Sequence, residues 1–214
     1  MALSDDKKLE ILNDHYKDTF SHIRNAIKTR DRLFFYLLLV LTIMYFQMVS
    51  PSEFDNAISK FISQKLNGVT LNITFIRGMI WFVLLSIVLR YCQTVVGIER
   101  QYSYIHKLEK ELTKFYPSEV TFTREGVSYL KNYPRLSDWA HILYTWVFPV
   151  FLLATITAKI YIEFPSQKQT SPDNNQLHFV VWGASLVFGL MVWITIGFYL
   201  YFRFQQSRTQ QNEA

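Results

Sequence analysis

Four apolar runs alternate with polar stretches along the chain, and this alternation predicts four membrane-spanning helices. The first run, residues 33–49, carries no charge over 17 residues. As a helix it would be about 26 Å long, enough to cross the hydrocarbon layer of a bilayer with little tilt. Three further runs occupy roughly residues 73–96, 141–158 and 179–202. The pattern therefore predicts an all-α, polytopic membrane protein.

The polar segment before the first span, residues 4–32, has the periodicity of an amphipathic helix. Its six acidic residues nearly balance its seven basic ones, whereas helices that lie on a membrane surface usually have a strongly cationic face. We therefore expect this helix to pack against another protein helix. One apolar stripe recurs at helical spacing: Leu12, Tyr16, Phe20, Ile23 and Ile27.

After the second span the helical pattern continues into a charged segment. We expect one long helix that leaves the membrane and ends before Pro117, with Gly97 as its weakest point. A short helix is predicted from Thr123 to Asn132, and Ser137 would cap the third span. The apolar positions of the long helix fall on one face: Ile98, Tyr102, Ile105, Leu108, Leu112 and Phe115.

The third and fourth spans have distinct local features. Pro149 is expected to kink the third span, and Lys159 at its end can extend its side chain toward the headgroups. In the fourth span Ser185, Gly189 and Gly197 are small residues that favour close helix packing in lipid.

These elements divide the chain into five regions. A cytosolic amphipathic helix (1–32) precedes spans one and two with their external connection (33–97). A cytosolic helical loop (98–138) leads to spans three and four (139–202), and a disordered cytosolic tail (203–214) follows.

The distribution of positive charge predicts the topology. Sixteen of the 22 Lys and Arg residues lie in residues 1–32, 97–140 and 203–214. Cytoplasmic segments are enriched in Lys and Arg, so both termini and the large loop are expected in the cytoplasm. The single cysteine, Cys92, excludes an internal disulfide and a cysteine-cluster metal site.

The second span is unusually short between two arginines. Only twelve residues separate Arg77 from Arg90, and they form about 18 Å of helix. Either both arginines extend outward to the interfaces, or Arg90 stays at membrane depth. In the second case Arg90, Gln93 and Thr94 would line a water-filled path.

The sequence carries no motif for catalysis or cofactor binding. It has no nucleotide-binding loop, nucleophile elbow or zinc-ligand spacing, so we expect neither an enzyme nor a cofactor nor a bound metal. His106 and Glu109 share a helix face, but we interpret them as an exposed polar pair.

The cytosolic loop interleaves cations with tyrosines, a pattern that suits phosphate contacts and base stacking. Six acidic residues in the same loop nearly cancel its charge, so three interpretations stay open: a compact cap, a surface for a partner protein, or a nucleotide or oligonucleotide site. The candidate binding residues are Arg100, Tyr102, Tyr104, Lys107, Lys110, Arg124, Tyr129, Lys131 and Arg135.

Four short spans, cytosolic termini and a charged central loop (IERQYSYIHKLEKEL…FTREGVSYLKNYP) resemble the small four-helix membrane subunits of bacterial anti-phage defence systems. The membrane effector of Hailong and the membrane subunit of Kiwa are examples. The resemblance implies a homo-oligomer, for instance a tetramer, that opens an ion path on a nucleic-acid-derived signal and disrupts the membrane. The alternative is a non-conducting scaffold that recruits a soluble cytosolic effector.

Overall fold

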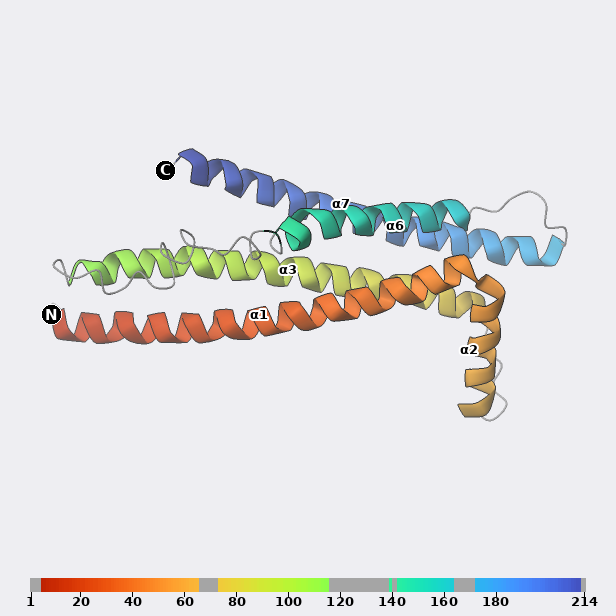
Figure 1. Cartoon of the computed structure of the whole chain (residues 1–214), viewed down its shortest axis with the longest axis horizontal. Helices are drawn as coiled ribbons and strands as arrows, with labels where there is room; N and C mark the ends of the chain where they lie inside the picture. Colours follow the sequence, from red (N-terminus) through yellow and green to blue (C-terminus); the bar gives the residue numbers. More distant parts are fainter. Residues whose placement is uncertain (1–4, 66–72, 116–138, 140–141, 164–171, 213–214) are drawn as a thin grey trace. The chain divides into compact units, whose positions relative to one another are not determined.

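The computed structural model describes residues 5–65, 73–115, 139, 142–163 and 172–212 (Figure 1). Every regular element in these ranges is helical, and four helices are long and apolar enough to span a membrane. The predicted all-helical class and the four apolar segments are thereby confirmed, while the orientation in the membrane stays a prediction. The elements are α1 (Asp5–Val49), α2 (Pro51–Lys65), α3 (Ile73–Thr113), a π-helical turn η1 (Leu143–Val147), α6 (Phe148–Ile162) and α7 (Pro172–Asn212).

Helix α1 joins the predicted amphipathic helix and the first span into one element of 45 residues. No glycine or proline lies between Asp5 and Val49, so nothing in the backbone interrupts the helix at residue 32. The chain turns at Ser50, and Pro51 begins α2, a position where its missing N–H costs nothing.

Helix α3 is unbroken over 41 residues, as expected for the second span and its extension. Gly97 lies inside this helix, and a methyl group added there would meet nothing within 4 Å. The helix predicted over 123–132 and the cap at Ser137 lie outside the described residues.

Pro149 lies in the first turn of α6, directly after the π-helical turn η1, and therefore inside the candidate span Leu143–Ile162. A proline cannot donate a hydrogen bond to the carbonyl four residues earlier, here that of Thr145, and its ring crowds that group. The wider π turn accommodates both effects, while the kink expected at Pro149 stays a prediction.

Helix α7 is longer than predicted at both ends. It begins at Pro172, before the predicted start of the fourth span at residue 179, and it continues to Asn212 through a tail expected to be disordered. The tail is rich in Gln and Arg and lacks Gly and Pro, so its intrinsic helix propensity is high once a helix precedes it.

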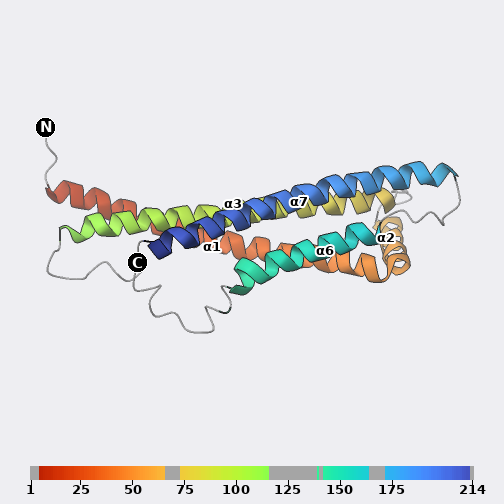
Figure 2. The same cartoon turned by 90° about the horizontal axis from the view of Figure 1, so that it is seen from above.

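The chain forms two compact units. The first comprises residues 1–32 and 93–145. Its parts of α1 and α3 run side by side in opposite directions (Figures 1 and 2). Ile23 of α1 and Ile105 and Leu112 of α3 are at 1% exposure or less, whereas the other residues of the α1 stripe are half-buried. The helix that residues 4–32 were expected to pack against is thus part of α3.

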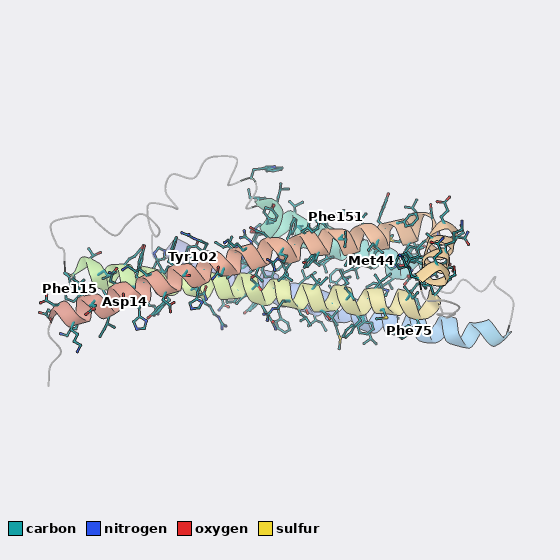
Figure 3. All side chains as sticks on the ribbon, turned by 90° about the horizontal axis from the view of Figure 1, so that it is seen from below. Asp14, Met44, Phe75, Tyr102, Phe115 and Phe151 are labelled. Carbon is teal, nitrogen blue, oxygen red and sulfur yellow. The ribbon has the colours of Figure 1, made fainter. Side chains whose placement is uncertain are left out.

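The second unit comprises residues 33–92 and 146–214 and contains α2, α6, α7 and the remaining parts of α1 and α3. Its core holds Leu37, Met44, Trp81, Ile156 and Val192, all fully buried. Only 28% of each spanning window is buried, so most apolar side chains point outward, as for a surface in contact with lipid (Figure 3). Within this unit α2 runs crosswise to the other helices (Figure 1).

Candidate functional site

A buried ion pair lies among the apolar helices of the second unit. The Lys159 ammonium group on α6 is 2.8 Å from a carboxylate oxygen of Glu163, one turn later. The same group donates a hydrogen bond of 2.6 Å to the Gln47 side-chain oxygen on α1. Lys159 is 1% exposed and Gln47 4%. The expectation that Lys159 extends outward is therefore wrong, because acceptors from two helices hold its charge inside.

A second ion pair joins α2 to α3. The Arg77 guanidinium lies 2.9 and 2.8 Å from the two carboxylate oxygens of Asp55 through a single nitrogen, Nη2. Both side chains are partly exposed. The sequence offered no acidic residue within an apolar run to neutralise an arginine; the partner comes from the polar connection 22 residues earlier.

The two pairs belong to one polar cluster, which we define as Gln47, Asp55, Arg77, Lys159 and Glu163. Gln47 lies two residues before the end of α1, Arg77 lies in the first turns of α3, and Lys159 lies in the last turn of α6. Phe46 and Phe54, the residues that directly precede Gln47 and Asp55, have ring centroids 5.9 Å apart, so the two pairs meet where α1 is followed by α2. Two cations and two carboxylates leave the cluster without net charge.

Three buried N–H groups beside or within this cluster lack an acceptor: Nε2 of Gln47, Nε of Arg77 and Nε1 of Trp81. Trp81 is one turn after Arg77 on α3 and is fully buried. A buried donor without a partner costs about 1–3 kcal/mol of stability. These N–H groups could therefore donate hydrogen bonds to an anion or to water. Among the described residues no group of three His, Cys, Asp or Glu side chains could hold a metal ion.

The predicted path residues lie elsewhere on α3. Arg90 and Gln93 are exposed and Thr94 is half-buried. Arg90 follows Arg77 by 13 residues, about 20 Å along a helix axis, so the structure does not bring it to the polar cluster.

The predicted binding residues are placed only in part. Arg100, Tyr104 and Lys107 are exposed and follow one another at helical spacing, so they share a face of α3. Lys110 is exposed and Tyr102 half-buried. Arg124, Tyr129, Lys131 and Arg135 lie outside the described residues.

The pair formed by His106 and Glu109 differs from expectation. His106 Nδ1 lies 3.5 Å from Glu109 Oε2, but the Glu109 side chain is only 7% exposed. It is buried because it falls between Ile105, Leu108 and Leu112 on the inward face of α3.

The three small residues of α7 have different surroundings. Ser185 is buried. A methyl group added to Gly189 would lie 2.5 Å from the end of Ile160 and 3.5 Å from Ile156, both on α6. At Gly197 it would meet nothing within 4 Å. Gly189 thus allows the close approach of α6 and α7, whereas Gly197 is open within the chain.

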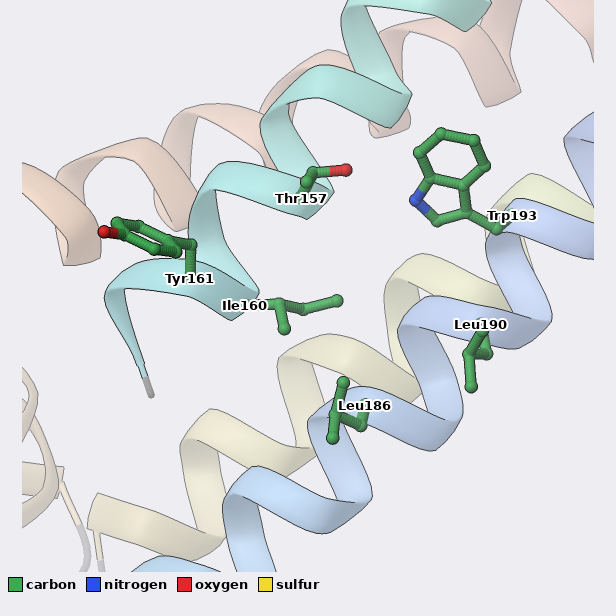
Figure 4. Close-up of a pocket in the computed structure, with 6 residues that line it drawn as sticks. All are labelled: Thr157, Ile160, Tyr161, Leu186, Leu190 and Trp193. Carbon is green, nitrogen blue, oxygen red and sulfur yellow. The ribbon is translucent and has the colours of Figure 1, made fainter. Parts of the chain in front are cut away.

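An apolar cleft of about 620 Å³ opens between α6 and α7 beside Gly189 (Figure 4). It offers almost no polar surface, so it can accommodate apolar groups such as acyl chains but provides no chemistry. Its lining residues are Thr157, Ile160, Tyr161, Leu186, Leu190 and Trp193.

No protein-family model, no curated protein and no solved structure matches this chain. The four long apolar helices among the described residues therefore define the class: a helical membrane protein with four candidate spans.

Proposed function

We propose that this protein is a homo-oligomeric, channel-like effector in a bacterial inner membrane, gated from the cytosolic side by a ligand or partner. In this proposal both termini are cytoplasmic, and opening disrupts membrane integrity as part of an anti-phage defence. The proposal rests chiefly on α3, a single helix that carries two kinds of exposed polar residues. Arg90 and Gln93 lie near the end of the apolar part of α3. Arg100, Tyr104 and Lys107 lie on the following turns.

An arginine in or beside an apolar helix is stabilised by water, by lipid headgroups or by polar groups of protein. In an oligomer, several copies of Arg90 would form a ring that attracts anions and repels cations, as charged rings do in channels. Because α3 has no break at Gly97, a ligand that contacts Arg100 and Lys107 would act on the same helix that carries Arg90.

Reconstitution in liposomes tests the proposal. The wild-type protein is expected to release entrapped ions when nucleotides, short oligonucleotides or a cytosolic partner are added on the side of the termini. Arg90→Leu is expected to abolish release or its anion preference without changing insertion or oligomer size. Arg30→Leu removes an arginine that is paired with Asp31 outside the apolar run and serves as the matched control.

A wild-type protein that assembles normally but never conducts under these conditions would contradict the channel proposal. The face formed by Arg100, Tyr104 and Lys107 then favours the second candidate, a scaffold that recruits a soluble effector. Co-purification of a stoichiometric soluble protein, lost on Arg100→Glu with Lys107→Glu, would support it.

A further inference from the structure

The Asp55 carboxylate occupies the cationic edge of the buried polar cluster. Both of its oxygens lie within hydrogen-bond distance of Arg77 Nη2. The preceding residue, Phe54, is 3% exposed, and its ring packs edge-on against Phe46 of α1 with 5.9 Å between centroids. This ion pair and this aromatic contact hold the first turns of α2 on the ends of α1 and α3.

Without Asp55 the cluster would carry one excess positive charge, because Lys159 and Arg77 would face only Glu163. It would also keep its three N–H groups without acceptors, on Gln47, Arg77 and Trp81. The side chains of Gln47 and Trp81 are more than nine-tenths buried, and the oxygen of Gln47 is already engaged by Lys159. The amide nitrogen of Gln47 is therefore held in the cluster as a donor.

One excess positive charge and a set of donors without acceptors are complementary to a monovalent anion. We propose that Gln47, Arg77, Trp81 and Lys159 form a binding site for a small inorganic anion such as chloride, and that Asp55 of α2 occludes it as a competing carboxylate. The anion enters when α2 moves away, because Arg77 then releases the Asp55 carboxylate and binds the anion in its place.

The binding site stands independently of any channel. Its role in transport rests on the proposed function: there the bound anion is the permeant ion. Helix α2, in the external connection, would then close the outer end of the path, in addition to the gating from the cytosolic side.

Chloride binding to the full-length protein in detergent tests the site. Thermal unfolding is followed while sodium chloride replaces sodium gluconate, whose anion is too large, at constant ionic strength. Asp55→Asn removes the competing charge but keeps the side-chain shape. It is expected to lower the half-saturating chloride concentration at least tenfold relative to the wild type.

Glu53→Gln neutralises an exposed carboxylate on the same helix and is expected to behave as the wild type. Adding Arg77→Gln to Asp55→Asn is expected to abolish the chloride effect. A response of Asp55→Asn equal to that of Glu53→Gln would overturn the proposal, as would a response that survives the loss of Arg77.

Hydrogen–deuterium exchange of the wild-type protein gives a second measurement that does not depend on a variant folding. Chloride is expected to accelerate exchange over Pro51–Lys65 and to leave Phe148–Ile162 unchanged, because it competes for Arg77. Equal exchange over Pro51–Lys65 in chloride and in gluconate would contradict the proposed competition between chloride and Asp55 for Arg77. Chloride binding without ion release in liposomes would contradict the channel proposal and leave the proposed binding site standing. Ion release without chloride binding would contradict only the binding site.

Discussion

The Lys159 ammonium group lies 2.6 Å from the side-chain oxygen of Gln47, although the two residues are 112 positions apart in the chain. This contact joins the end of α1 to the end of α6 among mostly apolar helices. A lysine in such a place is costly unless acceptors surround it, and here Gln47 and Glu163 both do so. The same three residues therefore determine stability and carry the polar character of the candidate site.

Removal of only one partner of this contact is expected to destabilise the protein strongly. Lys159→Ala leaves the buried oxygen of Gln47 without its donor and opens a cavity, so the free energy of unfolding should fall by about 3 kcal/mol. The triple change Lys159→Met, Gln47→Leu and Glu163→Gln removes the lysine, its amide acceptor and the carboxylate charge together, so it is expected to stay near the wild type. Unfolding in mixed micelles, followed by circular dichroism, measures both.

Lys65→Ala, at an exposed position on α2, is the control for loss of a lysine. A cost for Lys159→Ala no larger than that of Lys65→Ala would contradict a structural role for the buried ion pair.

Gly189 is expected to tolerate a large side chain poorly, because a Cβ there already meets the terminal carbon of Ile160 at 2.5 Å and a leucine adds three further carbons toward α6. Gly189→Leu should reduce the free energy of unfolding by about 2 kcal/mol through overpacking of α6 against α7. Gly197→Leu has open space around it and should leave the stability of a single chain unchanged. If Gly197 lies at a contact between copies, the same change lowers the oligomer size in native mass spectrometry. Equal effects of the two substitutions on unfolding would contradict this assignment.

The first unit is expected to depend on the buried face of α3. Ile105→Ala removes a fully buried side chain and should cost about 3 kcal/mol. Because α1 and α3 pack together in this unit, hydrogen–deuterium exchange should rise over residues 5–32. Tyr104→Ala, at a 44% exposed position next to it, is the control and should change exchange little. Unaltered exchange in Ile105→Ala would show that residues 5–32 pack elsewhere.

The charge distribution predicts that both termini are cytoplasmic. A C-terminal fluorescent-protein fusion, which matures only in the cytoplasm, is expected to fluoresce, and a C-terminal phosphatase fusion, active only outside, is expected to be inactive. The opposite pair of results would overturn the topology. A fusion within residues 66–72 should show the reverse pattern.

The sequence anticipated most of the helical architecture because hydrophobic periodicity is a local property. The apolar runs located four helices, and the stripe from Ile98 to Leu112 identified the face of α3 that is buried. The sequence pattern predicted the ends of the helices less well. Residues 203–212 were expected to be disordered, but they continue α7, because a helix already formed extends at low cost through favourable residues.

The candidate site was harder to anticipate. The sequence singled out Arg77 and Lys159 as charges at span ends and gave both an outward orientation. Nothing in their neighbourhood reveals that Asp55 and Gln47 lie beside them, since these partners are 22 and 112 residues away. The only available signal was positional. Arg77 and Lys159 lie at the ends of apolar runs, and Gln47 and Asp55 lie near the ends of other runs.

By itself the sequence determined that the chain is helical, that four segments suit a bilayer, and which residues of each helix form an apolar face, because these follow from local composition and period. Only the tertiary structure decided that Lys159 is buried rather than extended, that Asp55 covers Arg77, and that Gly189 rather than Gly197 permits close packing. These outcomes depend on which helices meet. A buried charge is stable only where distant acceptors converge on it, and no local pattern encodes that convergence.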